Sequence, residues 1–177
     1  MITAIRFLLI MTLITGVLYP VSVTLITQLC FPHQANGSLI YKNKTIVGSE
    51  LIAQATTSDG YFHPRPSAVN YQPASAGSNL SPASTKYWAT VATNNNLVSA
   101  QESSAMKMAS GSGLDPHILP NDAMAQLPRI IKARGWNTAK QAKLITLVKS
   151  KTEHPDFRIL GNSRVNVLAL NLALDTL

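Results

Sequence analysis

The chain has 177 residues, 46% of them hydrophobic, a formal net charge of +7 and a single cysteine. This length is enough for one domain with a core of its own beside a membrane segment. One cysteine excludes an internal disulfide and cysteine-based zinc sites, and the four histidines lack metal-ligand spacing, so we expect no metal site.

Residues 7–29 form a long apolar stretch without a charge, and the sequence after it is polar enough to be soluble. At about 1.5 Å per residue, a helix of this length spans roughly 34 Å, which crosses a hydrocarbon core of about 30 Å. The stretch exceeds the apolar region of about 7–15 residues in a cleaved signal peptide. We therefore interpret residues 1–31 as an N-terminal segment with a retained transmembrane helix, and residues 32–177 as one soluble domain.

The charges around this helix predict its orientation. Arg6 precedes it, whereas Lys42 and Lys44 follow more than ten residues after its end. Because positive charge stays inside, we expect a cytoplasmic N-terminus and an extracytoplasmic domain. A basic run without acids, residues 129–151, has only Trp136 as an aromatic neighbour, so it favours a solvated helical face near lipid headgroups or a partner, and we expect no nucleic acid.

After the helix, the pattern predicts short extended elements. Proline at position 32 ends the helix, and residues 33–37 form a short linker. Residues 38–41 and 45–47 flank Lys42-Asn43-Lys44, which predicts a β-hairpin with an asparagine turn. Residues 48–54 follow as a possible third extended piece.

The middle of the chain contains an irregular segment and a helix. Residues 59–82 have no helical or strand period but contain aromatic residues, which indicates an ordered loop. A helix is predicted over residues 82–95, with Ser81 as its N-cap and Pro82 at its first position. In the weakly patterned stretch that follows, Glu102 and Lys107 are expected on an exposed helical turn.

A second loop, residues 109–120, precedes two further helices. The first is expected to begin near the cap pair Asn121-Asp122 and to end at Gly135, with a kink or break at Pro128. The second is expected from the cap Thr138 to about Lys151.

The C-terminal region offers a turn and two ambiguous segments. Residues 154–156 read as a turn and residues 157–160 as a possible strand. Residues 164–177 fit a helix capped by Asn166, which Leu and Ala favour, or a strand with alternating leucines. The fold class is therefore α+β: one transmembrane helix, then a single domain of several helices and a small β-sheet.

Two features invite a binding or catalytic interpretation. Successive glycines in residues 110–116 can let backbone amides converge on an anion, but the P-loop lysine is absent, so a tight turn is favoured. Arg65, between two prolines, can clamp a carboxylate or phosphate, or, as we prefer, bond loop carbonyls. The weak anion or nucleotide candidates are Ser110, Gly111, Ser112, Gly113 and Asp115.

The chain lacks the motifs of common hydrolases. No G-x-S-x-G elbow surrounds Ser67, Ser78 or Ser110, and the few acids form no close pair. Asp115 and His117, two residues apart, need not face each other. These observations favour a subunit over an enzyme.

Six motifs then occur in a recognisable order along nearly the whole chain. They are GSELIAQ, YFHPRPSAVNY, GSNLSP, SGSGLDPHI, RIIKARG and RVNVLALNLALD. With the N-terminal apolar helix, they closely resemble the C subunit of the bacterial Kdp potassium-transporting P-type ATPase. The chain departs from the family pattern at SSAMKMA, just before SGSGLDPHI, and at AGSNL.

The resemblance implies a non-catalytic, single-pass subunit of a high-affinity, ATP-driven potassium importer in the bacterial inner membrane. Its partners would be the potassium-binding and ATP-hydrolysing subunits, so ATP and potassium belong to the complex, with no cofactor on this chain. The family's C subunit is needed for assembly and acts as a chaperone-like factor that raises ATP affinity of the hydrolysing subunit. Loop residues expected to support structure or partner contact are Arg65, Pro66, Ser67, Ser78, Asn79 and Asn166. The alternatives are a free-standing anchored binding protein or hydrolase of the envelope, and a secreted protein.

Overall fold

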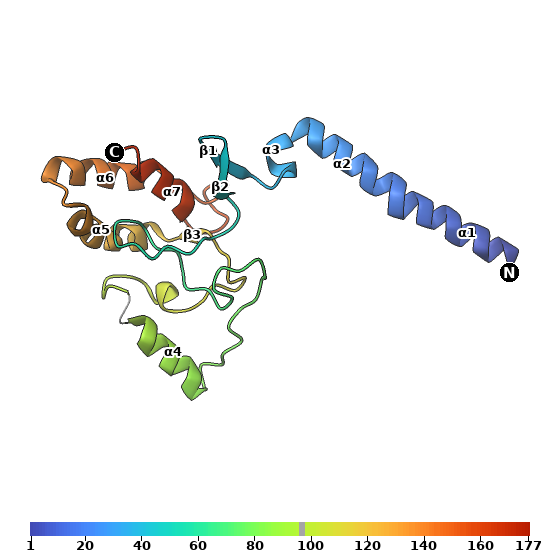
Figure 1. Cartoon of the computed structure of the whole chain (residues 1–177). Coiled ribbons are helices and arrows are strands. Elements are labelled where there is room, and N and C mark those ends of the chain that lie inside the picture. The colour runs from blue at the N-terminus through green and yellow to red at the C-terminus, as the bar shows by residue number, and fades with distance from the viewer. Residues whose placement is uncertain (96–97) are drawn as a thin grey trace. The chain divides into compact units, whose positions relative to one another are not determined.

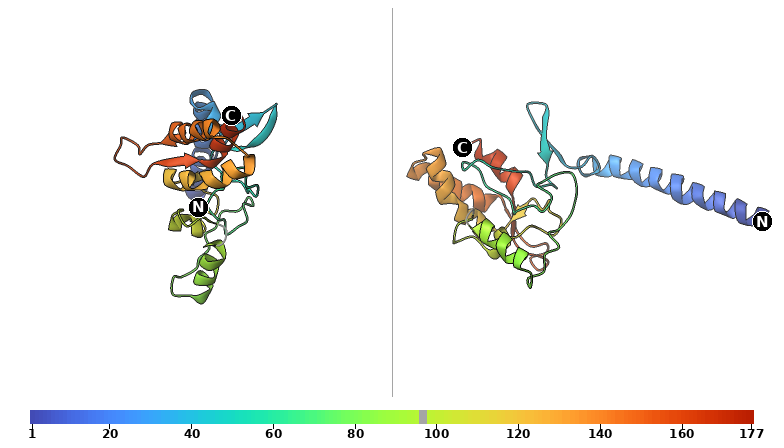
Figure 2. Two further views of the ribbon diagram at one scale, coloured as in Figure 1. Left: turned by 90° about the vertical axis from the view of Figure 1, so that its left-hand side faces the viewer. Right: turned by 60° about the horizontal axis from the view of Figure 1, so that its bottom comes forward.

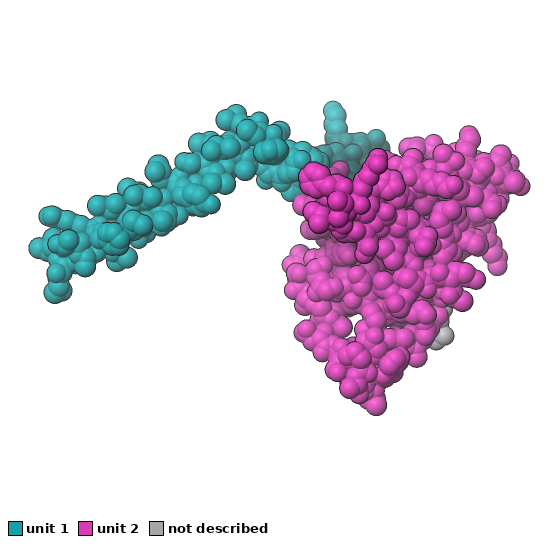
Figure 3. All heavy atoms as spheres, turned by 180° about the vertical axis from the view of Figure 1, so that it is seen from behind, with its two compact units in different colours: residues 1–49 teal, residues 50–177 magenta. Residues whose placement is uncertain are grey.

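A computed structural model describes residues 1–95 and 98–177 of the chain (Figure 1). The chain divides into two compact units, residues 1–49 and residues 50–177 (Figure 3). The expected domain boundary at residue 31 stays a prediction, because compact units are defined by contacts and not by independent folding.

The first unit begins with one apolar helix, Ile2–Cys30, which is long and apolar enough to cross a membrane. It consists of α1 (Ile2–Leu13), a π-helical turn (Ile14–Leu18) and α2 (Tyr19–Cys30). The helix begins five residues before the predicted start, because Arg6 is accommodated within its first turns. The π-turn lies just before Pro20, whose ring cannot fit a regular α-helical ladder.

Threonine hydroxyls inside this helix are satisfied by its own backbone. Thr15 donates to the carbonyl of Met11 at 2.7 Å, and Thr24 donates to that of Pro20 at 2.8 Å. Such bonds make hydroxyls tolerable in lipid, because no other partner is available there.

The segment after the helix corrects two expectations. Residues Pro32–Ala35 form a short helix, α3, rather than a linker, since proline is favourable at a first helical position. The hairpin is confirmed: β1 (Leu39–Lys42) pairs antiparallel with β2 (Thr45–Ser49). Its two turn residues, Asn43 and Lys44, have φ values of 52° and 66°, which suits the tight turns of hairpins.

The expected third extended piece is absent, because β2 ends at Ser49 and the chain turns at residues 50–52. The chain changes direction here to reach two distant segments of the second unit. Glu50 accepts a hydrogen bond from the Asn166 side chain at 2.7 Å, and Ala53 donates to the carbonyl of Leu114 at 2.9 Å.

The second unit surrounds a small antiparallel sheet with the strand order β3-β5-β4. Its sheet elements are β3 (His117–Ile118), β4 (Thr152–Glu153) and β5 (Arg164–Asn166); its helices are α4 (Thr85–Asn95), a 3-10 turn (Ser104–Lys107), α5 (Pro120–Arg134), α6 (Thr138–Ser150) and α7 (Val167–Leu174). Residue His117 pairs with Asn166, and Thr152 with Val165. These pairs place β5 in the middle, directly before α7. The α+β class is therefore confirmed.

The core lies between α5, α6, α7 and β5. Apolar side chains from each element are buried there, and they include Leu127 and Ile130 of α5 and Leu144 and Val148 of α6. Phe62, from the irregular segment, is also fully buried. This explains why a segment without periodicity is ordered.

Helix starts were the least accurate predictions. Helix α4 begins at Thr85, three residues late, and the Ser84 side chain accepts from the Tyr87 amide at 3.1 Å. Asn137, not Thr138, caps α6. At α5 the N-cap is Leu119, because Asp122 is buried and accepts two bonds from Ser103 instead.

Other local expectations had mixed outcomes. Pro128 does not break α5, because the flanking apolar residues hold the helix in the core. Glu102 is buried rather than exposed. Residues 157–159 form a turn rather than a strand. The C-terminal helix is confirmed, with Asn166 as its cap accepting from the Ala169 amide at 3.0 Å.

Candidate functional site

The two irregular loops singled out in the sequence lie against each other. The Ser110 amide donates to the carbonyl of Pro66 at 3.2 Å, and the Ala76 amide donates to that of Ser112 at 3.0 Å. The Ser75 hydroxyl reaches the same Ser112 carbonyl at 3.1 Å. We refer to residues 64–77 together with 110–116 as the loop pair.

Amides of the glycine-rich loop bond within the protein. The Gly113 amide donates to the Ser110 carbonyl, the Leu114 amide to the Ser112 hydroxyl, and the Asp115 amide to the Ser110 hydroxyl. Ser110 itself is only 2% exposed. These donors are therefore engaged by the fold and are not directed at a common anion.

Gly113 is where the two loops approach most closely. Its φ is +70°, and a Cβ added there would lie 2.6 Å from the Ala76 carbonyl oxygen and 3.4 Å from the Ser67 hydroxyl. The nearby Gly77 has a similar role, since its added Cβ would lie 3.0 Å from the Gly111 carbonyl. Both glycines allow backbone to pack directly on backbone.

Arg65 bonds a loop carbonyl, as the sequence favoured: its Nε donates to Ala105 at 3.1 Å. Its Nη1 also lies 3.7 Å from Asp115 Oδ2. Contrary to expectation, His117 faces Asp115, with Nδ1 3.3 Å from Oδ1. The hydrogen bond from His117 lowers the pKa of Asp115 below its usual value, although burial opposes this effect.

The remaining predicted residues support the backbone. The Ser67 hydroxyl accepts from the amides of Val69 and Tyr71 at 3.2 and 3.0 Å, so it stabilises a turn. Asn79 has a left-handed backbone, φ 53°, next to Ser78. Asn166 caps α7 and holds Glu50, away from the loop pair.

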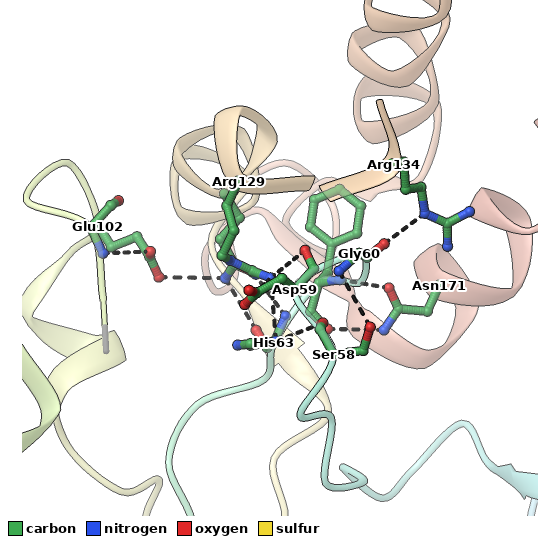
Figure 4. A network of polar contacts seen from close by, with 11 residues as sticks. Ser58, Asp59, Gly60, His63, Glu102, Arg129, Arg134 and Asn171 are labelled. Carbon is green, nitrogen blue, oxygen red and sulfur yellow. Dashed lines mark hydrogen bonds and ion pairs between the residues drawn. The ribbon is translucent and has the colours of Figure 1, made fainter. Parts of the chain in front are cut away.

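Sequence reasoning missed a pair of side-chain clamps, because no local pattern marks Asn171 and Gln126 as partners of the distant residues 62–63 (Figure 4). Asn171 on α7 accepts from the Phe62 amide at 2.8 Å and donates to the Phe62 carbonyl at 2.9 Å. Gln126 on α5 accepts from the His63 amide at 2.8 Å and donates to the His63 carbonyl at 3.2 Å. We refer to Asn171 and Gln126 as the amide clamps. They replace the strand partners that residues 62–63 lack.

A charged network continues from the clamps. Gln126 donates to buried Glu102 at 3.4 Å, and Arg129 donates to Gln126 at 2.8 Å and to the Asp59 carbonyl at 2.7 Å. Arg134 donates to the Gly60 carbonyl at 2.7 Å. Figure 4 shows Arg129, Arg134 and Asn171 converging on residues 58–63. Residues 58–63, which we call the strap, are thus held by side chains of α5 and α7.

The network borders a pocket of about 270 Å³ lined by His63, Tyr71, Glu102 and Arg129, among others. Burial lowers the pKa of His63, and the Arg129 charge lowers it further. Burial also lowers the pKa of Arg129 and raises that of Tyr71. Among residues 1–95 and 98–177, no group of three or more histidine, cysteine or acidic side chains is placed to hold a metal.

The lowered pKa of His63 predicts a pH dependence of stability. Between the folded-state pKa and 6.5, the unfolded chain binds more protons, so the free energy of unfolding falls as pH drops through this range. Thermal unfolding should occur at lower temperature at pH 5 than at pH 7.5. His63→Gln should flatten this dependence, because glutamine can still donate to the Ser58 carbonyl without titrating.

The control for this experiment is His154→Gln, because His154 is exposed. It should leave the pH dependence intact. Asp115 does not interfere, because the hydrogen bond from His117 lowers the pKa of this carboxyl group, which moves its titration further below the pH range of the experiment. An equal slope in the wild type and His63→Gln would contradict the assignment.

Known proteins of one family are similar to this chain along nearly its full length. The family model described as "KdpC: K+-transporting ATPase, c chain" matches residues 1–176. The chain is 45% identical to the potassium-transporting ATPase KdpC subunit of Rhodospirillum rubrum, over 93% of this chain and 89% of that protein. It is 45% identical to the KdpC subunit of Geobacter metallireducens, over 98% of this chain and 96% of that protein. It is 42% identical to the KdpC subunit of Cereibacter sphaeroides, over 97% of this chain and 94% of that protein.

Proposed function

Because the chain belongs to the KdpC family, the C chains of K+-transporting ATPases, we propose that it is a non-catalytic assembly subunit of a high-affinity potassium importer. As a family member it is an accessory subunit of a potassium-transporting, membrane-associated hetero-oligomer. The finer proposal is that its partners are the potassium-binding and ATP-hydrolysing subunits. Ion selection and ATP hydrolysis then occur on those chains.

One observation carries the non-catalytic role: the polar groups of the loop pair are bonded to other groups of the same domain. Its serines bond backbone amides, Arg65 bonds a carbonyl, and Asp115 pairs with His117 and Arg65. A nucleophile needs a free base beside it, and a phosphate site needs free amides. The loop pair supports neither, and this favours a role in shaping the domain and in contacting partner subunits.

We further propose that the N-terminus is cytoplasmic, that the domain lies outside the inner membrane, and that the chain raises ATP affinity of the hydrolysing subunit without binding ATP itself. The helix Ile2–Cys30 supports this coupling, because its most apolar part is not buried within the chain and is therefore available to pack against helices of the other subunits. Coupling between two states through packed membrane helices commonly amounts to about 1–3 kcal/mol.

Affinity purification through a tag after Leu177, from native membranes under mild detergent, tests the assembly role. The potassium-binding and ATP-hydrolysing subunits should be recovered with the tagged chain. Recovery of the chain alone would contradict it and favour a free-standing envelope protein. An intact mass that includes residues 1–29 would exclude a cleaved signal peptide.

Topology and nucleotide contact need separate measurements. A phosphatase that is active only when exported should be active when fused after Leu177 and inactive at the N-terminus. Nucleotide photolabelling of the complex in sealed, oriented vesicles should label the hydrolysing subunit. Label on this chain from the cytoplasmic side would contradict both the topology and the indirect effect on ATP affinity.

The helix is expected to pack on partner helices through Gly16. Small residues allow close approach of membrane helices, and one such contact is worth about 1 kcal/mol, or about fivefold in recovery. Gly16→Leu should therefore reduce recovery of the complex about fivefold. Leu9→Ala, at a position 63% exposed in the isolated chain, should have a smaller effect, and equal recovery of the two variants would exclude the contact.

A further inference from the structure

The connection between β4 and β5 presents three large apolar side chains to solvent. Phe157 is 88% exposed, Ile159 83% and Leu160 61%. The left view of Figure 2 shows this orange loop extending beyond the neighbouring helices. We refer to these three residues as the apolar knob. Single exposed apolar residues are common, but three in four consecutive positions mark an interaction surface.

The backbone of the knob is closed and well defined. The Asp156 amide donates to the Leu160 carbonyl and the Leu160 amide donates to the Asp156 carbonyl, each at 3.0 Å. Phe157 and Arg158 both have left-handed backbones, with φ of 52° and 64°, which side chains other than glycine rarely adopt. Asn43 and Lys44 have the same backbone in the β1–β2 hairpin, so these values describe a tight turn with a defined shape.

Ion pairs brace the base of the knob. Arg164 Nε lies 2.9 Å from Glu153 Oε2, and its Nη2 lies 4.0 Å from Asp156 Oδ1. The apolar side chains therefore point outward from a braced turn and not from a loose loop. A braced turn loses little conformational freedom on binding, which favours affinity.

The charges around the knob indicate what it binds. Glu153 and Asp156 are both paired with Arg164, whereas Lys151, which directly precedes β4, and Arg158, within the turn, are exposed, so the remaining charge of this connection is positive. A lipid surface is a poorer match, because a turn closed by backbone bonds and ion pairs holds its side chains in one arrangement, which suits a shaped pocket, whereas a fluid lipid surface offers no shape to fit. An apolar pocket with an acidic rim on a protein matches both the side chains and the charge.

We propose that the apolar knob docks into an acidic-rimmed apolar pocket on the extramembrane surface of another subunit of the same pump. The identity of this partner rests on the proposed assembly function. The knob supplies the central buried contact, and Lys151 and Arg158 supply the surrounding polar contacts, as in protein interfaces generally.

The test places a photo-crosslinking amino acid at position 157 of the full chain in native membranes. Irradiation should give an adduct with one pump subunit. The same group at exposed position 132 on α5 serves as the control and should give much less. The double variant Phe157→Ser, Ile159→Ser should reduce recovery of the partners on the order of tenfold or more. Ile46→Ser, at a site 60% exposed on the hairpin, should leave recovery unchanged.

Charge reversal gives a second readout that leaves the apolar side chains in place. Arg158→Glu combined with Lys151→Glu should weaken recovery several-fold and make it less sensitive to salt. Near-ultraviolet circular dichroism should be unchanged in all these variants, because the altered side chains are exposed.

The outcomes separate the two proposals. Recovery of the partners without an adduct from position 157, and without an effect of the double variant, would overturn the knob while leaving the assembly role. Failure of the wild-type chain to recover any subunit would overturn both. An adduct of position 157 with lipid, and none with a protein, would overturn the protein partner in favour of the membrane.

Discussion

Gly113→Ala is expected to destabilise the second unit by about 3 kcal/mol, and Gly113→Val by more. The left-handed backbone at φ +70° costs a side chain about 1–2 kcal/mol. The added Cβ would also lie 2.6 Å from the Ala76 carbonyl and 3.1 Å from a Val69 methyl group, and such overpacking costs about 1–3 kcal/mol. Urea unfolding of the full chain in detergent, followed by tryptophan fluorescence, measures the change.

Two other glycines separate the causes. Gly135→Ala has a left-handed φ of +59° but open space around the added Cβ, so it should cost only about 1 kcal/mol. Gly111→Ala has open space and no positive φ, so it should be neutral. If Gly113→Ala cost no more than Gly135→Ala, the loop pair would be loose enough to separate. The loop pair would then have no structural role in complex assembly.

Gln126→Leu is expected to cost about 4 kcal/mol, because it removes a buried clamp while preserving volume. Gln126 is only 2% exposed, and the substitution leaves the His63 amide and carbonyl without their partner. Each buried polar group left unsatisfied costs about 1–3 kcal/mol, and Glu102 also loses a donor. The same unfolding experiment applies, and amide hydrogen exchange at His63 should rise sharply.

The second clamp and a surface glutamine complete this series. Asn171→Leu should cost about 2 kcal/mol, less than Gln126→Leu, because Asn171 is only partly buried and water can replace it. Gln141→Leu, on the exposed face of α6, should stay within about 0.5 kcal/mol. A neutral Gln126→Leu would mean that residues 62–63 are held by Phe62 packing alone.

Local sequence patterns predicted the elements that depend on near neighbours. The apolar run predicted a membrane-length helix, and Gly135 predicted the end of α5. The hairpin followed from the polar turn at Asn43. Each signal lies within a few turns of helix or one hairpin, so no tertiary contact was needed to read it.

Expectations failed where distant contacts outweigh local preference. Asp122 has the chemistry of a cap, yet it accepts bonds from Ser103 across nineteen positions. Glu102 is charged, yet Gln126 and the Ser99 amide bond it in the interior. The candidate loops were found by composition, but their mutual contact and the amide clamps were not, because a side-chain amide binding a remote backbone leaves no periodic trace.

The order of synthesis delays the closure of the strap at residues 62–63. Phe62 leaves the ribosome long before Asn171, its partner 109 positions later, has been synthesised. At about 5–20 residues per second, this delay is roughly 5–20 seconds. Throughout that interval the Phe62 backbone lacks its clamp, and the core that buries its side chain lacks Val165, Val167, Leu170 and Leu174, so the nascent domain is a client for chaperones and proteases. A messenger truncated before the last helix would therefore yield a chain that inserts its N-terminal segment normally but is degraded because its domain never closes.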